Sequence, residues 1–505
     1  MAGNWLSITI DAVVILSLFT LCRKEYSAKN ILICFSPVIL ICLQFSVSCL
    51  NPSFKSFTDE DWGQLNISDY FAKEQNLGKA ILISEGIESI ILTSKKDPEL
   101  ANCLFFDLKN RYFDKYPGST SSTSKLLYRY EEIITLKSNS IIPTIPIFNH
   151  KSIYNFIHIL AQAIIGMIFY FLVKSRGSIR QIWKIIVMNA SLISVLGICQ
   201  KINYTPSDDL LEIWGVWDTP EPRYYFASFT YKNHWSAFSL MIISITASLL
   251  VNNAQRKGLH SLQSPSNIIL ILGLVSLSIS IPFSGSRSGS ILLILLMAGL
   301  AIISIRHFKL YKRNYLVSVG ICLIIFLFLC FFSTKIVHKE TINEMESNFS
   351  TQLDNLGKGK YPLRFLLWKD LIGQIYNKPV FGHGFNSYRS INPLFQSFEV
   401  RNERNKVLGG AHSKFIPLIS YGHSDWLQKI SEFGLSGFLL IFPLVGYIFF
   451  VFFSTRSLFV KYQIWGCIIF LIYSLVDFPS HSPICLITFS ILVGLSIKYN
   501  VISKP

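Results

Sequence analysis

The sequence predicts an all-α integral membrane protein with about eleven transmembrane helices and two long extracytoplasmic segments. Three observations predict this class. Hydrophobic residues make up 51% of the 505 residues and charged residues only 15%, a composition typical of membrane proteins. Apolar runs recur along the chain, and most are long enough to cross a bilayer as a helix. Lysine and arginine gather in alternate connections between these runs, as in multi-pass membrane proteins.

The first 50 residues are expected to hold two transmembrane helices, over 5–22 and 31–50. The start of the chain lacks a basic region and contains Asp11, so we expect a membrane helix there rather than a cleaved signal peptide. An extracytoplasmic insertion is expected at 51–151. Its run 80–93 carries acidic residues among apolar ones, which predicts an amphipathic surface helix rather than a span.

Nine further spans are expected in two groups, on either side of a long extracytoplasmic loop at 334–433. Residues 152–333 are predicted to hold spans at 153–173, 182–199, 235–251, 267–283, 289–305 and 315–333. Residues 434–505 are predicted to hold spans at 435–453, 463–476 and 483–499. The positive-inside rule puts the basic connections in the cytoplasm, so the N-terminus is expected outside and the C-terminus inside.

The charge and the cysteines exclude some classes of function. The net charge of +16 suits anionic lipid head groups and anionic substrates. The basic residues are spread between apolar runs and form no basic arm, which argues against nucleic-acid binding. The ten cysteines include no CxxC pair, so neither a disulfide framework nor a zinc site is indicated.

The long polar loop ends in YGHSDWLQKISEFGLSG, residues 421–437. Asp425 followed by Gln428 resembles a capping box, which predicts a helix that starts near Ser424 or Asp425. His423 then lies just before the helix, where the dipole favours a neutral, proton-accepting imidazole and attracts phosphate. An interfacial histidine that only caps the helix explains the same pattern, and both interpretations stay open. Asp425, Gln428 and Glu432 share one helical face, from which they orient His423 or bind sugar hydroxyls.

Arg223 and the run Lys232, Asn233, His234 flank the outer start of the fifth span. Arg223 and Lys232 are candidates to bind phosphate oxygens, and Asn233 is a candidate helix cap. Plain anchoring at the membrane interface by Lys, Trp and Tyr explains the run equally well.

Two other polar pieces stand at the external edge of the spans. Arg287 is the only charge in the turn SGSRSGS, and a charge at that depth is costly unless it meets an anion or a partner. A snorkelling arginine in a simple hairpin is the alternative. Arg364 and Trp368 share a helical face before a glycine-containing turn, and Trp368 with Tyr388 is a candidate to bind acceptor sugar. Structural packing is the favoured role for most of that piece.

These pieces together resemble motifs of the O-antigen ligase and O-antigen polymerase family. SFTYKNHWSAF is similar to the family's GTFxNxNHFA-type motif at Asn233 and His234, and SGSRSG to its SRG-type motif at Arg287. The stretch from Arg364 is similar to an R-x3-W...P-x2-G-x-G pattern. HSDWLQKISEFGLSG, which begins at His423, is similar to HNDxLQxxxExGxxG with serine in place of asparagine. SLVDFPSHSP resembles a late family motif, and the resemblance covers about 223–483.

The resemblance implies a glycosyltransferase of the bacterial inner membrane with a glycosyltransferase-C-like helical bundle. It implies transfer of a glycan from undecaprenyl diphosphate to an acceptor hydroxyl outside the cytoplasm, with neither cofactor nor metal. The acceptor is lipid A core in a ligase and another lipid-linked repeat unit in a polymerase, and the sequence leaves this choice open. A transporter or flippase of lipid-linked glycans is the alternative, but it needs polar residues throughout the spans rather than at their outer edge.

In the mechanism that the resemblance implies, Arg223 and Arg287 neutralise the diphosphate leaving group and His423 accepts the proton of the acceptor hydroxyl. The spacing at Arg223 departs by one residue from the family pattern, which weakens its assignment. The residues expected to bind substrate are Lys232, Asn233, His234, Arg364, Trp368, Asp425, Gln428 and Glu432.

Overall fold

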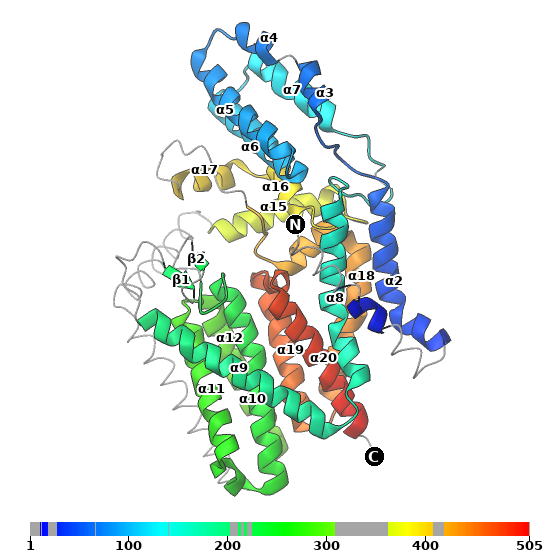
Figure 1. Cartoon of the computed structure of the whole chain (residues 1–505), viewed down its shortest axis with the longest axis vertical. Helices are drawn as coiled ribbons and strands as arrows, with labels where there is room; N and C mark the ends of the chain where they lie inside the picture. The colour runs from blue at the N-terminus through cyan, green and yellow to red at the C-terminus, as the bar shows by residue number, and fades with distance from the viewer. Residues whose placement is uncertain are drawn as a thin grey trace. The chain divides into compact units, whose positions relative to one another are not determined.

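The structure is a computed structural model, and it describes residues 11, 13–18, 28–65, 67–139, 141–202, 211–213, 217–219, 225–308, 362–407 and 419–503. Helices account for nearly all of the regular structure, which confirms the all-α membrane class (Figure 1). The sequence did not predict a short antiparallel pair of strands, β1 (Leu211–Ile213) and β2 (Trp217–Thr219). The chain divides into two compact units.

Unit 1 comprises 1–31, 157–355 and 443–505 and is a bundle of apolar helices. Its helices are α9 (Arg176–Ile202), α10 (Lys232–Lys257), α11 (Pro265–Phe283), α12 (Arg287–Phe308), α19 (Leu458–Val476) and α20 (Pro483–Ser503), with 3-10 turns η1 (Leu259–Gln263) and η2 (Pro479–His481). Helix α10 is the most buried of the candidate spans and packs against α9, α11, α12, α19 and α20. It is therefore the centre of the bundle.

Small residues allow the helices of unit 1 to approach closely. A Cβ atom added to Gly466 of α19 would lie 2.0 Å from the Ser244 hydroxyl of α10, and one added to Gly273 of α11 would lie 2.3 Å from the Ser191 hydroxyl of α9. The Ser244 hydroxyl itself donates to the carbonyl of Met241, so no polar atom of that serine faces lipid unpaired. This small-residue packing is typical of transmembrane bundles.

Unit 2 comprises 32–156 and 356–442 and is built from two distant parts of the chain. Its helices are α2 (Ala28–Cys49, which begins just before the unit), α3 (Asp59–Leu65), α4 (Ile67–Ala72), α5 (Leu77–Ser94), α6 (Pro98–Lys115), α7 (Ser122–Ile134), α15 (Leu363–Asn377), α16 (Tyr388–Phe395) and α17 (Phe398–Val407). Two helices continue from unit 2 into unit 1, α8 (His150–Leu172) and α18 (Asp425–Ser454).

An aromatic core holds the inserted segment of unit 2 together. Phe105 of α6 and Phe57 both stack on the ring of Tyr130 of α7, and Ile391 of α16 is buried in the same core. A buried ion pair then joins α6 to α17, with Arg404 Nη1 3.0 Å from Asp107 Oδ1. Helix α5 covers the run 80–93 and buries Ile83, Ile87 and Ile90 while both its glutamates are exposed, which confirms the predicted surface helix.

Eight helices of the described chain are long and apolar enough to cross a membrane, and they match eight of the eleven expected spans. The expected span 315–333 and most of 5–22 lie outside the described residues. The expected span 31–50 falls in α2, of which 36–49 form a shorter apolar helix. The count of eleven stays a prediction.

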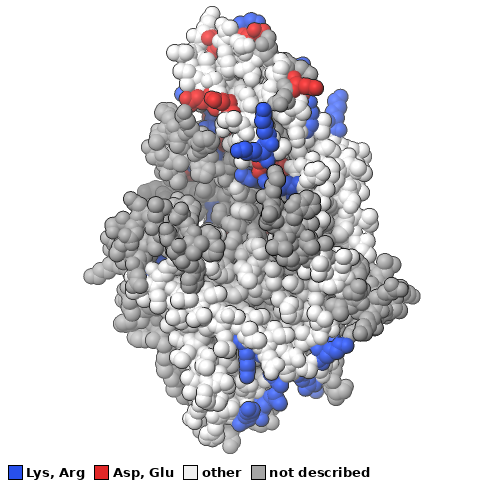
Figure 2. Space-filling view, viewed as in Figure 1, with Lys and Arg blue, Asp and Glu red and all other residues white. Residues whose placement is uncertain are grey.

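Basic residues gather at one end of unit 1. Consecutive helices of the bundle run in opposite directions, so the start of α9 and the ends of α10 and α20 lie together. Arg176 at the start of α9 donates to the carbonyl of Ile502 in α20 at 2.6 Å. Figure 2 shows lysine and arginine side chains at this lower end. The charge pattern from which the orientation was predicted is thus a real feature of the fold.

Candidate functional site

The predicted site residues fall into both units. Unit 1 holds Lys232, Asn233, His234 and Arg287, and Arg223 lies outside the described residues. Unit 2 holds Arg364, Trp368, His423, Asp425, Gln428 and Glu432.

The start of α10 is fixed by a buried carboxylate. Asn233 was expected to cap this helix, but the N-cap is Tyr231 and Asn233 is the second helical residue. The Asn233 amide instead donates to the Asp477 carboxylate at the end of α19 and to the Tyr231 hydroxyl. Asp477 is fully buried, and its other oxygen accepts the backbone N–H of Phe478 at 2.9 Å. Asp477 is thus a candidate site residue, which the sequence analysis included only as part of the SLVDFPSHSP resemblance.

His234 packs against two aromatic rings, Tyr231 and Phe478, which stack on each other. Its imidazole meets the rings of Tyr231 and Phe478 edge to face, with centroids 5.0 and 5.2 Å away. These contacts bring together the 231–234 run and the 477–483 turn, which both resembled family motifs.

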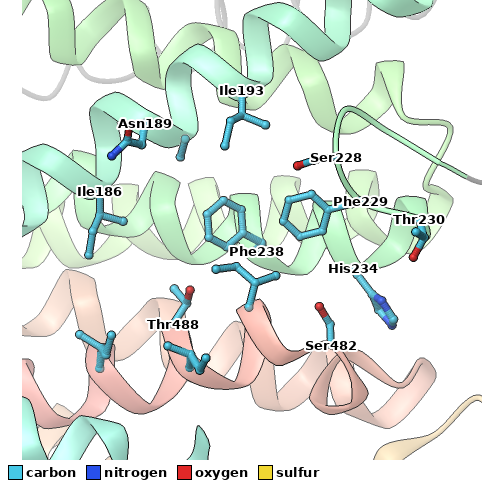
Figure 3. A pocket seen from close by; sticks show the side chains of 14 residues that line it. Ile186, Asn189, Ile193, Ser228, Phe229, Thr230, His234, Phe238, Ser482 and Thr488 are labelled. Atoms are coloured by element: carbon cyan, nitrogen blue, oxygen red, sulfur yellow. The ribbon is translucent and has the colours of Figure 1, made fainter. Parts of the chain in front are cut away.

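His234 also lines a cavity of about 530 Å³ in unit 1. In Figure 3, Thr230, His234 and Ser482 lie toward one end of this cavity, and Ile186 and Asn189 lie toward the other. Helices α9, α10 and α20 and the loop before α10 supply its walls. Its other lining residues are Ala190, Ile193, Ser228, Phe229, Phe238, Ile484, Ile487, Thr488 and Ile491. The cavity is therefore mainly aliphatic, with a cluster of hydroxyl groups and one imidazole at one end.

The turn that carries Arg287 packs against the start of α10. Gly285 has a φ of 74°, and a Cβ atom there would lie 3.6 Å from Lys232 Nζ. Ser286 caps α12 by accepting the N–H of Gly289 at 3.2 Å. Arg287 is exposed, and no described residue forms an ion pair or hydrogen bond with its guanidinium. A charge of this kind suits an anionic ligand at the membrane edge.

Lys201 of α9 adds a third cation, because its ammonium group interacts electrostatically with that of Lys232. It also lies 4.6 Å from the ring centroid of Tyr225. We call Lys201, Lys232 and Arg287 the cationic corner of unit 1. The sequence argument missed Lys201, because only packing brings the end of α9 to the start of α10.

In unit 2, α18 begins at Asp425 as expected, but the capping differs from the predicted box. Ser424 is the cap, since its hydroxyl accepts the N–H of Leu427 at 3.3 Å. The Gln428 side chain extends back past His423 to the preceding residue, where its Oε1 accepts the N–H of Gly422 at 3.0 Å. His423 lies between these contacts with a φ of 52°, a left-handed conformation that is uncommon outside glycine.

Asp425, Gln428 and Glu432 share one helical face, and that face is buried in the protein. Gln428 Nε2 donates to Glu432 Oε1 at 2.9 Å, and Lys429 Nζ lies 2.9 Å from Glu432 Oε2. On α15, Trp368 Nε1 donates to the His423 carbonyl at 3.2 Å, and Arg364 lies one turn before Trp368. The structure thus brings Trp368, His423, Gln428 and Glu432 together.

Glycines join the turn at residues 382–384, which we call the GHG turn, to α18. Gly384 has a φ of 103°, and a Cβ atom there would lie 2.0 Å from the carbonyl oxygen of Thr144. The N–H of Gly384 donates to the Glu432 carbonyl at 2.8 Å. Helix α18 is kinked at Gly434, and Gln44 Nε2 of α2 donates to the adjacent Phe433 carbonyl at 3.0 Å. The GHG turn and the first part of α18 therefore form one block.

His383 in the same turn is neutral at physiological pH. Burial, together with the smaller effect of the Lys378 charge, lowers its pKa from the ordinary 6.5 to about 4, although the hydrogen bond to the Gln374 backbone acts in the opposite direction. Its Nε2 lies 3.0 Å from the carbonyl oxygen of Gln374 and donates to it. The described residues contain no group of histidine, cysteine and acidic side chains that suits a metal ion.

The comparisons with known proteins concern the middle of the chain. Residues 272–442 match the family model described as O-antigen ligase. The match begins in α11 and ends in α18, so it contains Arg287, Trp368 and His423 but neither Asn233 nor Asp477. No curated protein and no solved structure matches the chain.

Proposed function

We propose that the protein transfers or polymerises glycans carried on undecaprenyl diphosphate, and the match of residues 272–442 to the O-antigen ligase family model supports this proposal. The family supports a glycosyl-transferring membrane enzyme in general. The proposal adds the lipid diphosphate donor, the extracytoplasmic face and the bacterial inner membrane.

The cationic corner is the observation that supports a lipid diphosphate as the donor. Lys232 and Arg287 are the first residues of α10 and α12, Lys201 lies at the end of α9, and the Lys201 and Lys232 ammonium groups interact electrostatically. A diphosphate carries the negative charge that suits such a set of cations, and the N-termini of α10 and α12 favour it further. These groups stabilise the diphosphate as its bond to the sugar breaks. Arg223 is proposed to assist in the same role.

The aliphatic cavity is proposed to hold the part of the lipid chain nearest the diphosphate. Its walls are mainly isoleucine and phenylalanine, and His234 lines the same cavity one residue after Asn233. Replacement of Ile186 by Trp fills the cavity, so we expect the KM for lipid-linked donor to rise roughly tenfold. Ile185→Trp is the matched control, because Ile185 is 60% exposed on the same turn. Equal KM values for the two variants contradict this assignment.

His423 is proposed as the general base. The acceptor hydroxyl oxygen attacks the anomeric carbon, its proton passes to the imidazole, and the carbon–oxygen bond to the diphosphate breaks with inversion. The proposed contacts to sugar come from Trp368 and Arg364 of α15.

The test is a glycan profile of a strain that lacks the protein, with lipid A-linked, lipid diphosphate-linked and secreted glycans separated. Full-length glycan that accumulates on undecaprenyl diphosphate and is absent from lipid A identifies a ligase. Single repeat units in place of long chains identify a polymerase. Unchanged pools overturn the proposal and leave transport of lipid-linked glycans as the function to examine.

A further inference from the structure

We infer that Gln428 and Glu432 are positioning residues that hold the His423 loop in its active conformation. The inference rests on the proposed role of His423 as the base. The sequence left two roles open for Gln428 and Glu432, the orientation of His423 and the binding of sugar hydroxyls, and the inference selects the first and names the contacts through which it acts. Their side chains are 1% and 0% exposed, so their polar atoms face the protein and not a glycan.

The backbone of His423 is in a left-handed conformation. A φ of 52° is sparsely populated for a residue with a Cβ atom, so the surrounding contacts must hold it there. Two contacts do so from opposite sides. Gln428 accepts the N–H of the preceding residue, Gly422, and Trp368 donates to the carbonyl of His423. The left-handed residue therefore lies between two fixed peptide groups.

The Glu432 carboxylate fixes the direction of the Gln428 side-chain amide. The Glu432 carboxylate pairs with Lys429 and only accepts hydrogen bonds, so the NH2 group of Gln428 must face it. This leaves the carbonyl oxygen of Gln428 facing the Gly422 N–H, at 3.0 Å. Glu432 thus sets which end of the amide meets the loop. Reversal of the amide would bring two N–H groups face to face and release the loop.

Glu432 is itself held in position by neighbouring contacts. Its backbone carbonyl accepts the N–H of Gly384, and the neighbouring Ser431 hydroxyl donates to Gln374 Oε1 at 2.8 Å. Gly422 has no room to move toward α15, because a Cβ atom there would lie 2.5 Å from Leu371 Cδ1. The chain of contacts from the GHG turn through Glu432 and Gln428 therefore ends on the histidine loop.

The test uses purified enzyme and lipid-linked donor, and compares Gln428→Glu with the exchanged pair Gln428→Glu/Glu432→Gln. In the single variant two carboxylates face each other, so we expect kcat to fall at least tenfold with little change in the KM for donor. In the exchanged pair, Gln at 432 donates to Glu at 428, which still accepts the Gly422 N–H. We expect kcat within about threefold of the wild type.

A wild-type kcat for Gln428→Glu, or an exchanged pair no more active than the single variant, overturns the inference. Trp368→Phe provides a second variant that keeps the ring and removes only the N–H donor, and we expect a several-fold lower kcat from it. Full kcat in Trp368→Phe contradicts the contact on the other side of His423. His423→Ala separates the two proposals: if it stays active the general base is wrong, and if only Gln428→Glu stays active the positioning role is wrong.

Discussion

Each unit contains a buried amide that donates to a buried carboxylate beside a histidine. In unit 1, Asn233 bonds to Asp477 across 244 residues of sequence, and His234 follows it. In unit 2, Gln428 bonds to Glu432 four residues later on the same helix, and His423 precedes them. The first pair joins the start of one helix to the end of another. The second pair spans one helical turn and directs the amide oxygen to a loop, so we expect the first to determine stability and the second to determine rate.

The largest expected effect tests whether the two histidines have different tasks. We expect His423→Ala to lower kcat by about a hundred- to ten-thousand-fold, because a proton acceptor in the transition state is lost. We expect His234→Ala to act mainly on the KM for donor, because His234 lines the cavity proposed for the lipid chain. Steady-state kinetics with purified lipid-linked donor separates the two effects. His150→Ala is the control, since this exposed histidine begins α8 and should leave both constants unchanged.

A smaller expected effect compares how much the Asp477 and Glu432 carboxylates contribute to the free energy of unfolding. We expect Asp477→Ala to lower the free energy of unfolding by about 3 kcal/mol, because the Asn233 amide and the Phe478 N–H both lose their acceptor in a buried site. We expect Glu432→Ala to cost less stability and more kcat, because its backbone contact with Gly384 survives. Thermal unfolding in detergent gives the first quantity and kinetics the second. Equal losses of stability would remove the distinction drawn between the pairs.

The smallest expected effect is a pH dependence that belongs to unit 2. His383 has a folded pKa of about 4, below its ordinary 6.5, so the unfolded chain binds more protons between these values. Its contribution to stability is complete above pH 6.5 and is lost as pH falls toward 4. At pH 5 the loss is about 2 kcal/mol. Thermal unfolding at pH 7 and pH 5 measures it, and His383→Gln should reduce the difference. A His383→Gln protein with the wild-type dependence would assign the effect to other groups.

The sequence predicted features that depend on composition and on near neighbours. The membrane class, eight of the described spans and the start of α18 at Asp425 all follow from hydropathy, charge alternation and capping residues. The run at α5 also followed from its pattern of glutamates among apolar residues. Each of these signals comes from residues that lie within about one helix length, along the sequence, of the feature they predict.

The contacts of the candidate site join residues that are far apart in the sequence, so local patterns did not predict them. The partner of Asn233 lies 244 residues away, and no local pattern marks Asp477 as its acceptor. Lys201 joins the cationic corner only through helix packing. The buried face of Gln428 and Glu432 was predicted as a face, but its neighbours come from α15 and the GHG turn. Periodicity therefore predicted which residues share a face, and the tertiary fold decided what each face meets.

The construction of unit 2 from two distant segments has a consequence for biosynthesis. Asp107 in α6 leaves the ribosome 297 residues before its ion-pair partner Arg404, and Asn110 leaves it 283 residues before the carbonyl of Pro393 that it binds. In a nascent chain the first segment of unit 2 therefore forms with Asp107 paired only to Arg111 of its own helix and with an aromatic core that still lacks Ile391. Completion of this unit must wait for synthesis of the second segment. Truncation between the two segments should thus yield a substrate for proteases rather than an independent domain.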